Sequence, residues 1–150
     1  MSELISVIIP TYNRYTYLLK TLESVKNQTH KNIEIIVVND GSSQEEYYQN
    51  KLEGCIVLNM DKNSKQRFGH ASPGGFQRSM GMKIASGEYY AFVDDDDYWM
   101  PDKLETQLRF MENNNYLFTY TNYETFGKKT KFISPAKEYD FKKFINDTCL

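Results

Sequence analysis

The sequence has few cysteines, no excess of basic charge and no long apolar run, and each deficit argues against a class of protein. Its two cysteines, Cys55 and Cys149, form neither a disulfide framework nor a metal-binding spacing, so we expect reduced thiols. The formal net charge is -2 and the pI is about 5.7, with Lys and Arg scattered singly, which argues against a nucleic-acid partner. No apolar stretch reaches the length of a membrane span, and no basic region precedes the first strand-like run. We therefore expect a cytoplasmic protein, with peripheral work at a membrane surface as an open alternative.

The length and the pattern of apolar residues predict an α/β protein. A chain of 150 residues matches one ordinary domain, so we expect a single domain over residues 1–150. Residues 5–9 form a nearly continuous apolar run, typical of a strand buried on both faces, and Pro10 is expected to end it. Leu18, Leu22 and Val25 recur at helical spacing. Successive β-α units predict a mostly parallel sheet flanked by helices on both faces.

The expected elements follow from these patterns and from the turn residues between them. Gly87 is expected to take the left-handed conformation that ends a helix. Residues 60–75 show no periodicity and are expected to be a long functional or mobile loop. Strands are predicted over residues 5–9, 33–38, 55–58, 88–93, 116–121 and 132–134. Helices are predicted over 15–28, up to about 52, over 73–85, from 101 onward and around 141–145.

Four consecutive aspartates, Asp94 to Asp97, directly follow the last strong strand pattern. Carboxylates this close raise one another's pKa, and a divalent cation is the simplest way to screen them. Mg²⁺ and Mn²⁺ prefer such oxygen ligands and usually hold them beside substrate phosphates. The alternative is a solvated acidic turn, which is what most charge runs are. The position at a strand end favours a metal-assisted site for a phosphorylated ligand.

Polar residues also follow the first two predicted strands, at residues 11–14 and 40–43. In an open parallel sheet, ligands bind beyond the carboxyl ends of the strands, so these residues and the aspartates are expected to meet at one edge. Tyr12 is suited to stack on a base, and Asp40 to accept from a base N–H or a sugar hydroxyl. The pattern therefore favours a nucleotide as the ligand.

Four separated segments resemble the family-2 glycosyltransferases of the GT-A (Rossmann-like) fold. They are residues 6–14, 37–43, 87–97 and 99–105, and the match runs in order from about residue 4 to about 115. The resemblance implies a nucleotide-diphospho-sugar donor, with UDP-sugars the commonest, a carbohydrate or glycoconjugate acceptor, Mn²⁺ or Mg²⁺ as cofactor, and transfer with inversion. It implies that Thr11 and Tyr12 line the base pocket, that Asp40 pairs with the base, and that Asp94 lies near the donor ribose. Asp96 is implied as the direct metal ligand. The residues assigned to nucleotide binding are Pro10, Thr11, Tyr12, Arg14, Asp40, Arg78, Asp94 and Asp95.

Several assignments have structural alternatives that the sequence leaves open. Asp40 also suits the cap of the helix that follows it, and Tyr12 also suits packing at the edge of the sheet. Arg78 is suited either to the diphosphate or to a structural ion pair. His70 is expected to be an exposed loop residue, and Trp99 is suited either to the acceptor site or to packing.

The general base that would deprotonate an acceptor hydroxyl is not identified. Asp97 belongs to the acidic loop, and no supporting context surrounds Glu124, Asp140 or Asp147. We therefore expect a truncated or minimal acceptor side, with a homo-oligomer as one way to complete it. The open alternatives are a nucleotide-sugar-binding fragment without turnover and a phosphoryl-accepting signalling domain. The sequence speaks against the last, because its acidic residues are not split between strands.

Overall fold

The computed structural model describes residues 3–70 and 74–125. The chain divides after Leu108 into two compact units, and the second, from Arg109 on, is described only to residue 125. A single domain over residues 1–150 stays a prediction. The predicted elements at 132–134 and 141–145, together with Cys149, Asp140 and Asp147, lie outside the described residues.

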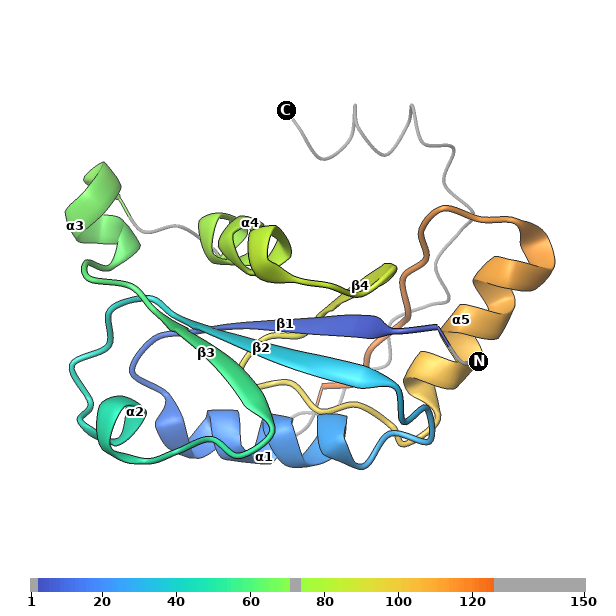
Figure 1. Cartoon of the computed structure of the whole chain (residues 1–150), viewed down its shortest axis with the longest axis horizontal. Coiled ribbons are helices and arrows are strands. Elements are labelled where there is room, and N and C mark those ends of the chain that lie inside the picture. The colour runs from blue at the N-terminus through green and yellow to red at the C-terminus, as the bar shows by residue number, and fades with distance from the viewer. Residues whose placement is uncertain (1–2, 71–73, 126–150) are drawn as a thin grey trace. The chain divides into compact units, whose positions relative to one another are not determined.

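A parallel four-stranded sheet in the order β3-β2-β1-β4 forms the centre of the first unit (Figure 1). Every residue of β1 is buried, as expected of a strand with neighbours on both sides and helices on both faces. Ile5 lies opposite Ile33 on one side and opposite Tyr89 on the other. The first four predicted strands are confirmed. Their bounds are β1 Ile5–Thr11, β2 Ile33–Asn39, β3 Cys55–Asn59 and β4 Tyr89–Phe92.

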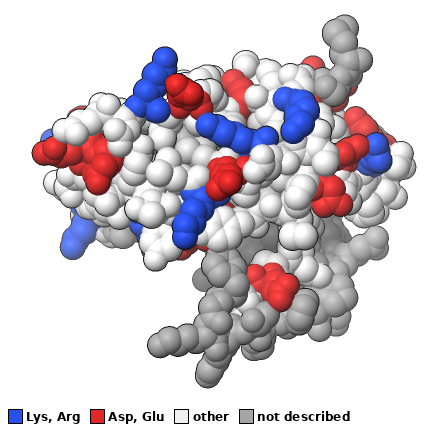
Figure 2. All heavy atoms as spheres, turned by 90° about the horizontal axis from the view of Figure 1, so that it is seen from below, with Lys and Arg blue, Asp and Glu red and all other residues white. Residues whose placement is uncertain are grey.

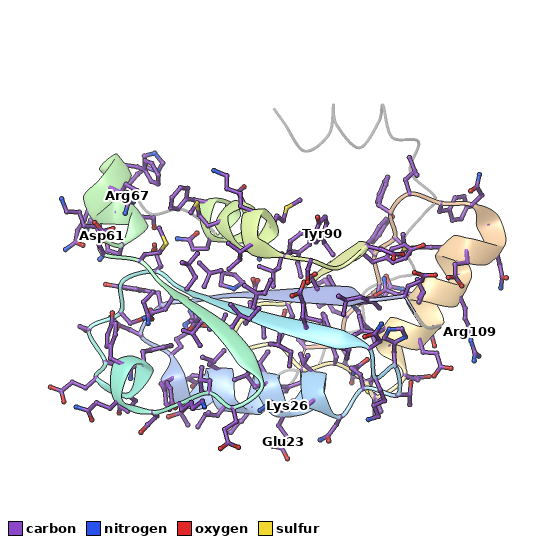
Figure 3. The ribbon with its side chains drawn as sticks, in the orientation of Figure 1. Glu23, Lys26, Asp61, Arg67, Tyr90 and Arg109 are labelled. Carbon is purple, nitrogen blue, oxygen red and sulfur yellow. The ribbon has the colours of Figure 1, made fainter. Side chains whose placement is uncertain are left out.

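Helices lie on both faces of the sheet, as predicted: α1 and α2 on one face and α4 on the other (Figure 1). In α1, Leu18, Leu22 and Val25 are buried at the expected spacing. Glu23, on the same helix, points away from the sheet (Figure 3), and the exposed Lys26 donates to the carbonyl of Glu53 over 2.8 Å. The helix bounds are α1 Tyr15–Lys26, α2 Glu46–Gln49, α3 Ser64–Phe68, α4 Gly75–Ile84 and α5 Lys103–Asn114.

The core has two layers because alternate strand residues face opposite helices. Val7 and Val37 belong to the layer that packs on α1. Ile8 and Val38 belong to the layer under α4. On α4, Gly81 approaches this second layer so closely that a Cβ there would lie 2.5 Å from Ile8 Cγ2. A small residue at this position therefore sets how near α4 comes to the sheet.

Pro10 does not end the first strand, contrary to expectation. β4 pairs with β1 only as far as Ile8, which lies opposite Phe92, whereas β2 continues beside Pro10, with Val38 opposite. Proline has no backbone N–H to donate, so it fits a strand at a position where one side has no partner strand. β1 therefore continues to Thr11.

The expectation of an irregular loop over residues 60–75 is also wrong, because it contains α3. This helix begins with a capping box: the Asn63 side chain accepts from the backbone N–H of Gln66, and the Gln66 side chain accepts from that of Asn63. Asp61 and Arg67 form an ion pair beside it (Figure 3). Five residues are too few for an apolar period, so only the capping pair signals the helix.

Gly87 does not take the left-handed conformation, since α4 ends at Ile84 and Ala85 is extended. A Cβ at Gly87 would lie 2.4 Å from the Oγ of Ser6 and 2.7 Å from the backbone nitrogen of Ser6. Glycine is needed here because the chain passes directly against β1. In the second unit, residues 116–121 form no strand, so that prediction is wrong as well.

Charges of both signs are interspersed on the face of the molecule seen in Figure 2. The described residues of that face form no continuous basic surface of the kind that binds nucleic acid. Within the described part of the chain, no helix combines the length and apolar character needed to cross a membrane.

Candidate functional site

The ends of β1, β2 and β4 meet at one edge of the sheet, as the sequence predicts. The backbone N–H of Asp40, after β2, donates to the carbonyl of Thr11 over 2.9 Å. The hydroxyl of Thr11 donates to the carboxylate of Asp95, after β4, over 2.7 Å. Residues from all three strand ends are therefore in direct contact. We call this edge the rim.

The loops after β1 and β2 are joined by side-chain hydrogen bonds. Asn13 has a φ of 53°, in the left-handed region that asparagine tolerates better than most residues. Its side-chain oxygen accepts from the backbone N–H of Ser43 over 2.8 Å, and its own N–H donates to the hydroxyl of Ser42 over 2.9 Å. The Gln44 side chain accepts from the N–H of Tyr15 over 3.0 Å. These bonds fix the positions of the two loops relative to each other.

The acidic residues 94–97 form a turn in which one carboxylate points inward and its neighbours point outward. The N–H of Asp97 donates to the carbonyl of Asp94 over 3.1 Å. Asp95 is 5% exposed, whereas the side chains of Asp94 and Asp96 are 53% and 45% exposed. The two outward carboxylates thus belong to alternate residues of the turn. Asp95 between them is placed to anchor the turn, and a direct contact of Asp95 with nucleotide stays a prediction.

Asp95 is held by the loop that follows β1. Besides Thr11, the backbone N–H of Tyr12 bonds its carboxylate, and the guanidinium of Arg14 lies 3.4 Å away. Burial raises the pKa of Asp95, and the bonds from Thr11 and Arg14 work in the opposite direction. The turn is thus fixed by a buried carboxylate whose partners come from a distant part of the chain.

Two arginines reach the outward carboxylates. Arg14 donates to Asp96 over 2.7 Å, and the charges of Asp96 and then Asp95 raise the pKa of Arg14. Arg78, from α4, pairs with Asp94. The ion-pair alternative for Arg78 is therefore present in this structure, and the same position leaves both guanidinium groups beside the outward carboxylates. Guanidinium groups placed in this way are suited to bind phosphate oxygens.

Gly74 and Pro10 lie beside the guanidinium group of Arg78. Gly74 has a φ of 82°, and a Cβ on it would lie 2.8 Å from Arg78 Nη1 and 3.4 Å from the ring of Pro10. The absence of a side chain at position 74 leaves room for the guanidinium. Pro10 is thereby placed next to the predicted diphosphate-binding groups.

Tyr12 and Asp40 both contact the start of α3, which the sequence reading missed. Asp40 is 7% exposed, and its oxygens accept from the backbone N–H of Ser64 at 3.0 Å and from the Ser64 hydroxyl at 2.8 Å. Tyr12 is 44% exposed, and its hydroxyl accepts from the side chain of Asn63 over 3.3 Å. Asp40 therefore stabilises the start of α3 in this structure and not the start of α2, the following helix, which was the alternative expected from the sequence. Pairing of Asp40 with the base stays a prediction. The Asn63–Gln66 capping pair was the available signal for this segment.

Trp99 lies away from the rim. Its backbone N–H donates to the hydroxyl of Ser24 over 3.2 Å, near the far end of α1, and its ring packs against the core. The next turn contacts the segment before β2, since the carbonyl of Pro101 accepts from Thr29 over 2.8 Å. The packing alternative for Trp99 is thus the one observed. His70 is exposed, as expected.

No acceptor-side base is identified among the described residues. Asp97 lies on the exposed side of the turn, where partial shielding of its carboxyl group from water, followed by the charges of Asp94, Asp96 and Asp95, raises its pKa. Glu124 is exposed in the second unit.

An open recess beside the edge strand β3 is a weaker candidate for the ligand site. It is lined by residues of β2, α2 and β3, and its one carboxylate is Glu34. That carboxylate already accepts from Ser6, Ser86 and Gly87, and although burial opposes them these bonds lower the pKa of Glu34. The rim, with its outward carboxylates and two arginines, is better suited to a charged ligand.

The rim fits a divalent cation that shares its ligands with a substrate. Within residues 3–70 and 74–125, no three His, Cys, Asp or Glu side chains are grouped to hold a metal by themselves. Mg²⁺ and Mn²⁺ do not require such a cage, since they commonly bind one or two carboxylates together with phosphate oxygens and water. The outward carboxylate of Asp96 can supply a protein ligand of this kind.

Comparisons with known proteins show the family to which the chain belongs. The family model described as glycosyl transferase family 2 matches residues 6–149. An uncharacterized glycosyltransferase of Rickettsia bellii is 38% identical over 139 residues, which cover 91% of this chain and 19% of that protein. The Escherichia coli protein WfaP, named a UDP-Glc:alpha-D-GlcNAc-diphosphoundecaprenol beta-1,3-glucosyltransferase, is 37% identical over 122 residues, which cover 81% of this chain and 46% of WfaP.

A solved structure gives the same result for the fold. S. aureus TarS 1-349, in a crystal structure described as a complex with UDP-GlcNAc, has a TM-score of 0.60 and 32% identity. The match covers 74% of this chain and 32% of the TarS chain, and it confirms the predicted GT-A fold. The chain thus spans less than half the length of each of these relatives. On the family model and these relatives together, the chain belongs to glycosyl transferase family 2.

Proposed function

We propose that the rim binds the nucleoside diphosphate of a nucleotide-sugar donor and serves sugar transfer to an acceptor hydroxyl. One observation carries the proposal: Asp94 and Asp96 face outward from a turn anchored by Asp95, with Arg14 and Arg78 beside them. Carboxylates and guanidinium groups so close together suit a site where a metal ion and a diphosphate share charge. WfaP, which is named as a glucosyltransferase that uses UDP-Glc, and TarS, which is described in complex with UDP-GlcNAc, support a uridine donor.

Each rim residue has a role in this proposal. Tyr12 stacks on the base, and Asp40 accepts a hydrogen bond from it with the lone pair that Ser64 leaves unused. Thr11 and Pro10 form the floor of the pocket. Asp94 lies near the ribose, and Arg78 balances the charge of the diphosphate.

Asp96 would hold the cation, Mn²⁺ or Mg²⁺. When bound, that ion would supply positive charge to the departing diphosphate, so that the protein need not protonate it. Arg14 now occupies one oxygen of Asp96, and its side chain is half exposed. Arg14 is therefore able to turn toward phosphate when the cation takes its place on the carboxylate.

Transfer with inversion requires a carboxylate base on the face of the sugar opposite the leaving group. That base and the acceptor pocket are not assigned to described residues. The second candidate function, donor binding without turnover, uses the same rim. It differs only in that no glycoside product forms when an acceptor is added.

Calorimetric titration of UDP in the presence and absence of Mn²⁺ tests the proposal. We expect binding that depends on Mn²⁺ and that weakens at least about tenfold in Asp96→Asn, since a charge-assisted contact is worth about 1.5–3 kcal/mol. Glu23→Gln is the matched control, because Glu23 points away from the sheet on the outside of α1 (Figure 3). Unchanged UDP binding in Asp96→Asn would contradict the metal role, and no binding of UDP, GDP or dTDP by the unaltered chain would contradict the donor site.

A further inference from the structure

Tyr47, on α2, is a buried tyrosine whose hydroxyl reaches the rim. The residue is 3% exposed, and its ring packs edge-to-face on Tyr15 with the centroids 5.2 Å apart. Its hydroxyl lies 2.6 Å from Thr11 Oγ1 and accepts from the backbone N–H of Arg14 over 3.1 Å. The hydroxyl of Ser42 also bonds it. One side chain therefore joins α2 to both loops that form the rim.

Donor and acceptor counting fixes the direction of the bond between Tyr47 and Thr11. Thr11 has one hydroxyl hydrogen, and it is donated to the ionised carboxylate of Asp95, which can only accept. The short contact of Tyr47 with Thr11 must therefore be a donation from Tyr47. The result is a continuous chain of hydrogen bonds from the Arg14 N–H through Tyr47 and Thr11 to Asp95. Bonds in such a chain polarise one another, most strongly where the surroundings exclude water.

We propose that Tyr47 is a positioning residue for the donor site, acting through Thr11 on Asp95 and so on the turn that presents Asp94 and Asp96. The functional part of this inference rests on the proposed donor site. Tyr47 itself is inside the protein, behind Thr11, and does not touch a ligand at the rim. Its hydroxyl holds Thr11 in the rotamer that bonds Asp95, and it holds the backbone of Arg14, whose side chain bonds the same turn.

The hydroxyl, and not the ring, carries this role. Phenylalanine at position 47 keeps the packing on Tyr15 but leaves the Arg14 N–H without its acceptor and Thr11 without its donor. A buried donor that loses its partner costs more than the bond itself contributed. The expected consequence is a turn that opens more often, with its outward carboxylates less well placed.

Tyr47→Phe and Tyr48→Phe form a matched pair for the test. Tyr48 is the next residue of α2 and is 53% exposed, and its hydroxyl donates to the backbone carbonyl of Ser42 over 2.8 Å and not to Thr11, Arg14 or Asp95. Amide hydrogen exchange of Asp97, whose N–H bonds Asp94, reports opening of the turn in the ligand-free protein. We expect exchange at least about fivefold faster in Tyr47→Phe and unchanged in Tyr48→Phe. Equal exchange in both variants would overturn the proposal.

Titration of UDP with Mn²⁺ extends the test to ligand binding. We expect a Kd at least about fivefold weaker in Tyr47→Phe and unchanged in Tyr48→Phe. In a Thr11→Val background the chain of bonds is already broken, so Tyr47→Phe should add little further weakening, whereas a packing effect would add in full. Losses of UDP affinity that simply add in the double variant would show that Tyr47 does not act through Thr11, and would overturn the proposal. If the unaltered chain binds no nucleotide but the exchange result holds, the donor site fails while the positioning of the turn by Tyr47 stands.

Discussion

The hydroxyl of Thr11 donates a hydrogen bond of 2.7 Å to the carboxylate of Asp95, although 84 positions separate the two residues in the chain. Both are nearly inaccessible to solvent, at 3% and 5% exposed. A buried carboxylate costs free energy unless it is hydrogen-bonded, so this bond offsets part of the cost of removing Asp95 from water. It allows a carboxylate to sit inside the sheet edge and hold the acidic turn from within.

Thr11→Val is expected to lower the free energy of unfolding by about 1–3 kcal/mol, because valine keeps the shape of threonine but leaves Asp95 without its hydroxyl donor. Urea denaturation measures the change. Thr16→Val, at an exposed position of α1, is the control and should change stability by less than about 0.5 kcal/mol. Equal stability of the two variants would mean that Asp95 does not depend on Thr11.

The sheet and the rim could be predicted from the sequence because their signals are local and strong. β1 and β2 are nearly continuous apolar runs, and each is followed at once by polar residues. The carboxyl ends of neighbouring parallel strands lie at one edge, so the meeting of Thr11, Asp40 and the acidic turn follows from topology alone.

The missed features depend on contacts between distant residues or on very short signals. Gly87 looked like a helix terminator, yet its role is set by the close passage of Ser6 of β1. Tyr47 carries no motif, and its contact with Thr11 spans 36 positions. α3 is too short for periodicity and is marked only by its capping pair. Nothing in local propensity encodes the first two, because each is decided by packing.

Gly87→Ala is expected to destabilise the protein by more than about 2 kcal/mol. The added Cβ would meet backbone atoms, the nitrogen of Ser6 at 2.7 Å and the carbonyl of Leu4 at 2.8 Å, and backbone cannot move aside as a flexible side chain can. Gly75→Ala is the matched control, because a Cβ there meets nothing within 4 Å. At the start of α4 alanine should be neutral or stabilise by up to about 1 kcal/mol. Thermal unfolding measures the stability of both variants. A similar melting temperature for Gly87→Ala and Gly75→Ala would contradict the close contact between Gly87 and β1.

Gln28 joins the end of α1 to the start of α5, and Gln28→Leu should cost about 2–4 kcal/mol. The side chain is fully buried, donates to the carbonyl of Met100 over 2.7 Å and accepts from the N–H of Leu104 over 3.0 Å. Leucine has a similar volume but leaves both backbone groups without partners. Urea denaturation measures the loss. Gln49→Leu, which removes one exposed bond to Glu45, should change the free energy of unfolding by less than about 0.5 kcal/mol. Equal stability of the two variants would contradict a structural role for Gln28.

Lys103 should make the stability of the protein depend on pH in the alkaline range. Burial lowers the pKa of Lys103 from 10.5 to about 8. The unfolded chain therefore binds more protons than the folded one between about pH 8 and pH 10.5, and the free energy of unfolding rises with pH through this window. The ring of Trp99 lies 3.7 Å from the ammonium and favours its charged form, which reduces the cost of burial.

Lys103→Met removes the buried charge and keeps most of the apolar volume. Near pH 7 this variant should be more stable than the unaltered protein by about 1–3 kcal/mol, since each unit of pKa shift corresponds to about 1.4 kcal/mol. The difference in stability should shrink as the pH rises from about 8 toward 10.5, because Lys103 then loses its proton and with it the cost of burial.

Urea denaturation at pH 7, 8, 9 and 10 measures the trend, with Lys20→Met at an exposed position of α1 as the control. Comparison at each pH cancels the titration of the many tyrosines, which all three proteins share. A difference between Lys103→Met and the unaltered protein that stays constant from pH 7 to 10 would mean that the ring of Trp99 fully offsets the burial of the ammonium.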